Sequence, residues 1–128
     1  MLQNARRPKK KFIKFHANPE PITISTVSEG RYIDVNDSFL RITGYLRGEV
    51  IGRTSIELKF WEATEDRSKF IGLLKKHASV RNLEINFFTK SGEKRTGMIS
   101  GENIDIDGQM CVIAIVQDLT DQKALAGC

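Results

Sequence analysis

The sequence feature that most constrains the fold is a series of three long β-type stretches joined by very short turns. The alternation of apolar and polar residues predicts strands over Val80–Lys90, Glu93–Ile106 and Gln109–Leu119. Asp107-Gly108 is a typical two-residue hairpin turn because both residue types accept positive φ angles, and Ser91-Gly92 supplies the turn before it. Strands joined this tightly pair antiparallel, which excludes a doubly wound parallel sheet.

The last predicted strand indicates how the sheet is covered. Residues 111–116 are apolar without a break, whereas a strand with one face in solvent alternates apolar and polar residues. We therefore expect cover on both faces, with Met110, Val112, Ala114 and Val116 on one and Cys111, Ile113 and Ile115 on the other. The stretch Val80–Lys90, in contrast, alternates cleanly, with Leu83, Ile85 and Phe87 on its apolar face.

The first half of the chain predicts a short hairpin followed by helices. The hairpin pairs Ile22–Val27 with Tyr32–Val35 across Ser28-Glu29-Gly30. Three helical stretches are expected next: Ser38–Thr43, with an N-cap at Asn36 or Asp37 and Gly44 at its end, Tyr45–Ile51 before Gly52, and Glu65–Ala78, capped by Thr64. This order predicts an α+β domain, with the helices inserted between two halves of one sheet.

Positive charge is concentrated in the first 15 residues. The chain has 20 basic residues and a formal net charge of +4, and this segment contains Arg6, Arg7, Lys9, Lys10, Lys11 and Lys14. The rest of the chain holds the other 14 basic residues and all 16 acidic ones, a net charge of −2, so we expect no nucleic-acid-binding face on the domain. We expect a basic leader over 1–17, a domain over 18–120 and the start of a connector helix over 121–128. Binding of nucleic acid or anionic lipid by the leader alone stays an alternative.

Several protein classes are disfavoured by what the sequence lacks. The longest apolar stretch, Met110–Val116, is far shorter than the roughly 20 residues of a membrane-spanning helix. The only cysteines, Cys111 and Cys128, indicate neither a disulfide framework nor a metal site and favour a cytoplasmic location. Catalytic signatures such as a Gly-rich phosphate loop are absent, so we expect no enzyme activity in this chain.

Four separate segments resemble a PAS domain, a sensory module of signalling proteins. They are GRYIDVNDSFLRITGY (30–45), GEVIGRT (48–54), TKSGEKR (89–95) and QDLTDQK (117–123), in the family's order. The resemblance covers about residues 18–123. It implies the PAS fold, a five-stranded antiparallel sheet in the order 2-1-5-4-3, with short helices between strands 2 and 3 and a pocket between sheet and helices.

For the function, the resemblance implies a sensory domain of a bacterial signal-transduction protein, such as a histidine kinase or a diguanylate cyclase. Such a domain binds a small ligand or forms a homodimer through its outer sheet face and flanking helices, and signals through its C-terminal helix. Asp118 and Thr120 lie at the junction with that helix, and capping of its first turn is the simpler role for both. The alternative is a ligand-free dimerisation module with a filled core.

The candidate pocket residues come from the predicted helices and the inner face of the sheet. They are Phe39, Ile42, Trp61, Phe70, Leu74, Leu83, Ile85, Phe87, Val112, Ala114 and Val116. Because nearly all of them are strongly apolar, they indicate either a flat apolar ligand or a packed core, and both interpretations stay open at this point.

Individual residues give no support to a particular cofactor or metal. His77, where a haem ligand would be sought, lies beside lysines that indicate a solvated helix end. Cys111 lies far from the segment that carries the reactive cysteine in light-sensing flavin relatives, so haem and covalent flavin are both disfavoured. Glu49 with Lys90 or Arg95 resembles a salt bridge that some PAS relatives form at the pocket mouth, although solvated surface charges are the simpler interpretation.

Overall fold

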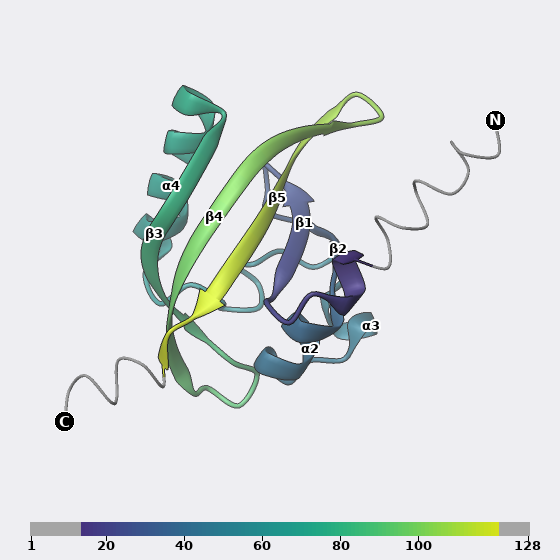
Figure 1. The fold of residues 1–128 in the computed structure, drawn as a ribbon, viewed down its shortest axis with the longest axis vertical. Helices are drawn as coiled ribbons and strands as arrows, with labels where there is room; N and C mark the ends of the chain where they lie inside the picture. The colour runs from purple at the N-terminus through teal and green to yellow at the C-terminus, as the bar shows by residue number, and fades with distance from the viewer. Residues whose placement is uncertain (1–13, 121–128) are drawn as a thin grey trace, which may run out of the picture.

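The structure, a computed structural model, describes residues 14–120. One antiparallel sheet has the strand order β2-β1-β5-β4-β3, which confirms the expected topology. The strands are β1 (Ile22–Thr26), β2 (Tyr32–Val35), β3 (Ser79–Phe88), β4 (Lys94–Ile106) and β5 (Gln109–Asp118). Between β2 and β3 the chain forms α2 (Asp37–Thr43), α3 (Arg47–Val50) and α4 (Thr64–His77), so the predicted α+β order is confirmed (Figure 1).

The two ends of the chain lie mostly outside this description. Of the predicted leader over 1–17, only residues 14–17 are described, and they form a single helical turn. The predicted connector helix over 121–128 lies wholly outside the described residues. Between residues 14 and 120, no helix is both long enough and apolar enough to cross a bilayer.

The long hairpin of β4 and β5 forms as the Asp107-Gly108 turn predicts. Asp107 and Gly108 have φ angles of 51° and 84°, which is the backbone that such a two-residue turn requires. The Gly108 amide also donates to Asp105 Oδ1 (2.8 Å). From this turn the strands pair without a break, from Ile106 opposite Gln109 to Gly97 opposite Asp118.

The expectation of uninterrupted alternation in β3 is wrong at the start of the strand. Val80 pairs with Gly101 and Leu83 with Ile99, so β3 contains one residue more than β4 in this interval. The extra residue forms a β-bulge at Asn82, whose φ angle is 56°. Asn adopts this left-handed backbone conformation more readily than most residues. The Asn82 amide donates to Ser100 Oγ (3.0 Å).

The helix ends match the predictions only in part. Asn36 caps α2 and Gly44 ends it in the left-handed region (φ 83°), both as expected. The predicted cap of α4 by Thr64 is wrong, because Thr64 is already helical and Ala63 precedes it without a side-chain cap. The stretch Tyr45–Ile51 is helical only over the four residues of α3.

The helices and the inner face of the sheet enclose the apolar core. In Figure 1, α4 lies beside β3 at one edge of the sheet, and α2 and α3 lie near β1 and β2 at the other. Two glycines of β4 let neighbouring side chains approach the backbone closely: a Cβ added at Gly101 would lie 2.6 Å from Phe70 Cζ, and one at Gly97 would lie 2.9 Å from Val116 Cγ1. The close approach of Phe70 to Gly101 fixes the position of α4 over the sheet.

Candidate functional site

The predicted pocket residues come together in one cluster between sheet and helices. Ile42 and Leu83 are partly buried and pack against that cluster. The other predicted residues are buried members of it: Phe39, Trp61, Phe70, Leu74, Ile85, Phe87, Val112, Ala114 and Val116. Their contact with a ligand stays a prediction, because every one of them also has a place in the packing of the core.

Aromatic rings fill the centre of this cluster. The Phe60 ring stacks on Phe87 with a centroid distance of 5.0 Å and lies 6.2 Å from Phe39 on its other side. Trp61 meets Phe60 edge-on at 5.6 Å and reaches Phe70 at 6.1 Å. The gap that remains beside Phe60 and Phe87 is too narrow to admit a water molecule. The described residues therefore form a packed aromatic core.

Two aromatic core residues, Tyr32 and Phe60, are missing from the predicted pocket set because they lie in short segments that carry no periodic signal. Phe60 belongs to the connection between α3 and α4, and Tyr32 opens the four-residue strand β2. Burial is the main reason that the pKa of the Tyr32 phenol lies well above its ordinary value, although the charge of Arg67 opposes that shift. The indole of Trp61 is satisfied within the core, where Nε1 donates to Ser55 Oγ (3.0 Å).

An ion pair joins the turn between β3 and β4 to α3. Lys90 Nζ lies 2.7 Å from Glu49 Oε2, with both side chains more than a third exposed. The hydrogen bond from the Leu46 backbone, followed by that from Lys90, lowers the pKa of Glu49. Glu49 thus pairs with Lys90, one of its two expected partners, whereas Arg95 pairs with Asp118.

Arg95 holds the junction that follows β5. Its Nε donates to Asp118 Oδ2 (2.6 Å), and Asp118 Oδ1 accepts from the Thr120 amide (3.0 Å) and hydroxyl (2.7 Å). Thr120 Oγ1 in turn accepts from the Thr96 amide (3.0 Å). Burial opposes ionisation of Asp118, but the bonds from Thr120 and Arg95 outweigh it and lower the pKa of this carboxyl.

The Asp118–Thr120 junction is thus hydrogen-bonded to β4 as well as capped by its own residues. The Leu119 amide also donates to the Thr96 carbonyl (2.8 Å). The contact of Asp118 with the amide two residues on is the geometry expected of a helix N-cap or an Asx turn. Its predicted role as the passage to a connector helix stays a prediction, since that helix lies beyond the described residues.

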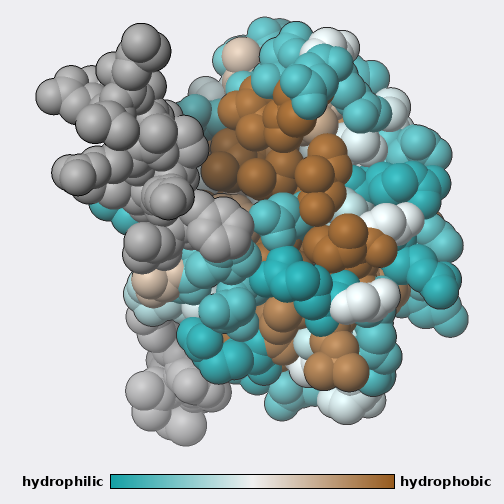
Figure 2. All heavy atoms as spheres, turned by 90° about the vertical axis from the view of Figure 1, so that its right-hand side faces the viewer, coloured by the Kyte–Doolittle hydropathy of each residue, from teal (hydrophilic) through white to brown (hydrophobic). Residues whose placement is uncertain are grey.

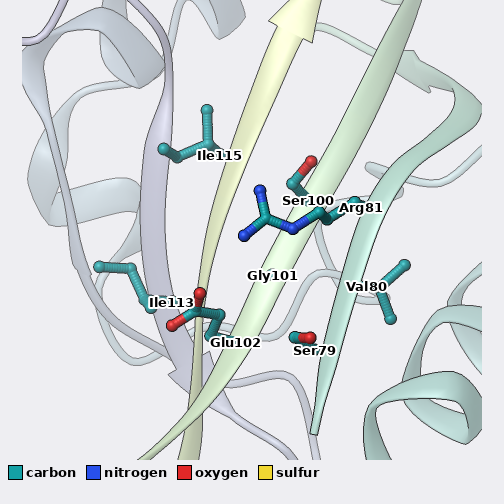
Figure 3. A pocket seen from close by; sticks show the side chains of 8 residues that line it. All are labelled: Ser79, Val80, Arg81, Ser100, Gly101, Glu102, Ile113 and Ile115. Carbon is teal, nitrogen blue, oxygen red and sulfur yellow. The ribbon is translucent and has the colours of Figure 1, made fainter. Parts of the chain in front are cut away.

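The outer face of the sheet carries a shallow groove. It measures about 300 Å³ and lies across β3, β4 and β5 (Figure 3). Ile113, Ile115 and Gly101 are among its lining residues, and Arg81 and Glu102 place a cationic and an anionic side chain beside them. The expectation that Ile113 and Ile115 are fully covered is only partly met, because both remain half-buried, whereas Cys111 is fully buried.

Apolar side chains also gather elsewhere on the surface. Figure 2 shows them on the side of the molecule that carries β2 and α3. The large apolar side chains exposed in the described part are Ile33, Leu46, Ile51, Ile56 and Met110. Exposed apolar groups in such numbers are consistent with contacts to another protein surface.

No metal centre emerges from the described residues. Residues 14–120 contain no group of three or more His, Cys, Asp or Glu side chains placed to bind a metal ion. His77, the residue at which a haem ligand would be sought, is exposed at the end of α4. The Cys111 thiol has a raised pKa through burial and the charge of Asp105, so it is held as a neutral, buried group.

Comparison with known proteins places the fold in a family. The family model described as "PAS domain" matches residues 19–121. Among solved structures, the PAS domain of an HTR-like protein from Haloarcula marismortui is 20% identical, with a TM-score of 0.71 and coverage of 92% of this chain and 99% of that one. A PAS domain from Colwellia psychrerythraea gives 18% identity and a TM-score of 0.75, covering 88% of this chain and 97% of that one.

A third solved structure comes from a signalling enzyme. It is a domain of a sensory box sensor histidine kinase/response regulator from Geobacter sulfurreducens, 22% identical with a TM-score of 0.68, and the match covers 91% of this chain and 94% of that one. No curated protein matches the sequence. The sheet order, the helix positions and the family match agree, and the chain belongs to the PAS domain family of sensory modules.

Proposed function

We propose that this PAS domain is a ligand-free regulatory module that dimerises and relays a signal between the segments on either side of it. The observation that carries the proposal is the aromatic core: Phe39, Phe60 and Phe87 stack at 5.0–6.2 Å where a ligand would otherwise lie. A ligand in that space requires the rings to move apart, at the cost of close contacts between buried groups. Between residues 14 and 120, the core near these rings leaves no such space for the rival function, binding of a flat apolar ligand.

The outer face of the sheet supports the dimerisation step. On the face opposite the core, Ile24 of β1 lies opposite Ile113 of β5. These two residues and Ile115 form a half-buried apolar stripe, whereas Ile22, which lies opposite Ile115, is already buried. A twofold dimer brings this apolar stripe against its own copy, as a symmetric interface requires. The expected leader over 1–17 and the expected connector helix over 121–128 would extend the same interface.

The Asp118–Thr120 junction supports the relay step. Because Arg95 and Thr96 bind it directly, a shift of β4 against β5 changes the direction in which the chain leaves the sheet. The parent protein in this proposal is a cytoplasmic bacterial signal-transduction protein, such as a histidine kinase or a diguanylate cyclase. Solved PAS domains from histidine kinases support that choice.

Light scattering coupled to size-exclusion chromatography tests the dimer. The full chain is run over a concentration series beside Ile113→Lys and a matched control, Ile56→Lys. Ile56 is an equally apolar, 43% exposed residue on the connection between α3 and α4. We expect the wild type and the control to dimerise and Ile113→Lys to remain monomeric. A monomeric wild type at high concentration, or a dimer that Ile113→Lys leaves intact, contradicts the proposed interface.

A further inference from the structure

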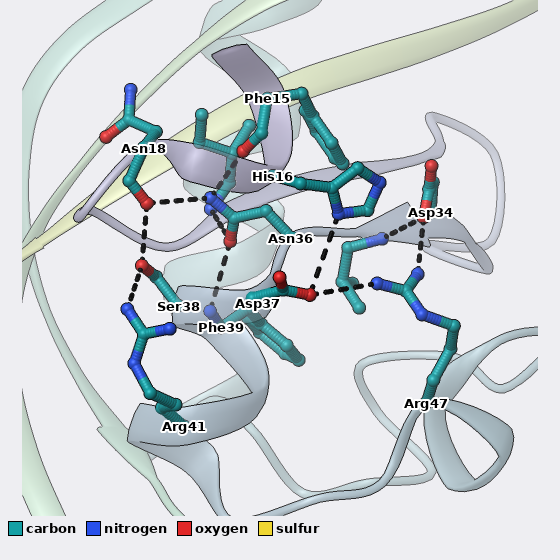
Figure 4. A network of polar contacts seen from close by, with 12 residues as sticks. Phe15, His16, Asn18, Asp34, Asn36, Asp37, Ser38, Phe39, Arg41 and Arg47 are labelled. Carbon is teal, nitrogen blue, oxygen red and sulfur yellow. Dashed lines mark hydrogen bonds and ion pairs between the residues drawn. The ribbon is translucent and has the colours of Figure 1, made fainter. Parts of the chain in front are cut away.

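The side chain of Asn36 joins three parts of the domain through one fully buried amide group. Its Oδ1 accepts from the amide of Ile22 at the start of β1 (2.9 Å) and from that of Phe39 in α2 (3.1 Å). Its Nδ2 donates to the carbonyls of Phe15 and Glu20, both at 2.9 Å. Figure 4 shows the amide lying between residues 15–18 and the first turn of α2.

A second contact fastens the same stretch of chain. Ser38 Oγ donates to the Asn18 carbonyl (2.7 Å) and accepts from Arg41 Nη2 (2.8 Å). We call residues 14–21 the entry segment, because they lead directly into β1. Three consecutive residues at the start of α2 hold this segment: Asn36 and Ser38 bind its backbone carbonyls, and Asp37 Oδ1 lies 3.7 Å from His16 Nδ1 (Figure 4).

The two ends of the Asn36 amide perform separable tasks. The oxygen caps α2 and meets the first amide of β1, a role that an Asp carboxylate fulfils as well as Asn does. The nitrogen donates to the carbonyls of Phe15 and Glu20 in the entry segment, and an ionised carboxylate has no proton to donate to them. Asn36→Asp therefore removes the Nδ2 bonds to the entry segment and preserves the cap, whereas Asp37 and Ser38 keep their contacts with that segment.

The far end of α2 contacts the hairpin that holds the exit of the domain. The Thr43 carbonyl, in the last residue of α2, accepts from the Lys90 amide (2.8 Å). Lys90 belongs to the turn between β3 and β4, and Arg95, just beyond that turn, binds Asp118 (2.6 Å). A continuous series of hydrogen-bonded elements thus runs from the entry segment, through α2 and the β3–β4 turn, to the Asp118–Thr120 junction.

We propose that Asn36 is a latch that couples the entry segment to α2, so that displacement of this segment by the preceding chain or by a partner loosens the exit junction. The signal then enters through the polypeptide and needs no ligand in the core. This inference rests on the proposed relay function and identifies the entry segment as the place where the signal enters the domain. It assigns to the latch two states, one with the entry segment bound to Asn36 and one with it released.

Hydrogen exchange measured by mass spectrometry on the full chain tests the latch. Asn36→Asp is compared with the wild type and with Asn82→Asp, a matched change at the exposed bulge of β3. In Asn36→Asp we expect exchange in residues 14–21 to rise by about tenfold, the effect of losing buried hydrogen bonds. We expect a smaller rise at Leu119 and Thr120, no change at the Phe39 amide, and no change in any of these segments for Asn82→Asp.

Each other outcome contradicts a defined part of the inference. Unchanged exchange in residues 14–21 shows that Asn36 is not a latch. Faster exchange there with no change at Leu119 and Thr120 overturns the coupling to the exit. If Asn36→Asp unfolds, Ser38→Ala, which spares the α2 cap, must still accelerate exchange in the entry segment and at the junction, or the proposal fails. The dimer content of the same samples reports separately on the proposed function.

Discussion

Replacement of Gly101 by Ala tests whether the space between α4 and the sheet is as fully occupied as the structure indicates. The added Cβ would lie 2.6 Å from Phe70 Cζ and 3.1 Å from Val112 Cγ2. Both neighbours are 2% exposed, and a ring held in a packed core cannot turn aside as a flexible surface side chain can. Overpacking of this kind costs about 1–3 kcal/mol of unfolding free energy.

The assay is urea unfolding followed by the fluorescence of Trp61, the single tryptophan of the chain. Gly72→Ala is the matched control, because Gly72 is helical and a Cβ there meets nothing within 4 Å. We expect Gly72→Ala to stabilise the protein by about 0.5–1 kcal/mol, the usual gain from Gly to Ala inside a helix. Gly101→Ala should instead destabilise it.

A double variant isolates the contact itself. Phe70→Leu removes the ring atom that the new Cβ would strike, so Gly101→Ala should cost about 1 kcal/mol less in the Phe70→Leu background than in the wild type. If Gly101→Ala is as stable as the wild type, or if the two substitutions are strictly additive, the close packing of α4 on β4 is refuted.

Three further outcomes follow from the site. Phe60→Ala should cost about 3–5 kcal/mol and create a cavity that binds benzene or indole in a thermal-shift assay; equal binding by the wild type would contradict the filled core. The pKa of Asp118 is lowered in the folded state. The ionised carboxylate therefore contributes to the free energy of unfolding above its unfolded pKa, and this contribution is lost as the pH falls through the folded pKa. In urea titrations below about pH 5, the unfolding free energy of Arg95→Gln should therefore fall less with decreasing pH than that of the wild type. An unchanged dependence on pH would argue against the ion pair. Lys90→Ala should leave the urea midpoint nearly unchanged because its partner Glu49 is solvent-exposed, and a large drop would assign the pair a structural role.

Local sequence signals predicted those parts of the fold that depend on a few neighbouring residues. The Asp107-Gly108 turn and the Asn36 cap formed as expected, since each rests on the backbone preference of its own residues. The alternating pattern of β3 failed at Asn82, where the pairing with β4 accommodates an extra residue. The start of α4 was also misplaced, because Ala63 occupies the N-cap position without a capping side chain.

The candidate site shows the same division between local and distant information. The predicted pocket residues do share one cluster, because strand alternation and helix periodicity identify the faces that point inward. The sequence could not decide between a ligand and a filled core, because Phe60 lies in a connection without periodicity and its stacking on Phe87 is a tertiary contact. The bond between Arg95 and Asp118 joins residues 23 positions apart and left no local signal.

The proposed function requires that the PAS core is filled by its own side chains. Native mass spectrometry of the full chain, purified without added ligands, tests it most directly. We expect the masses of the bare polypeptide and of its dimer, and an absorption spectrum with aromatic side-chain bands alone. A retained small molecule that adds a fixed mass to each chain, and that is lost when Phe60 or Phe87 is replaced by Trp, would contradict the filled core.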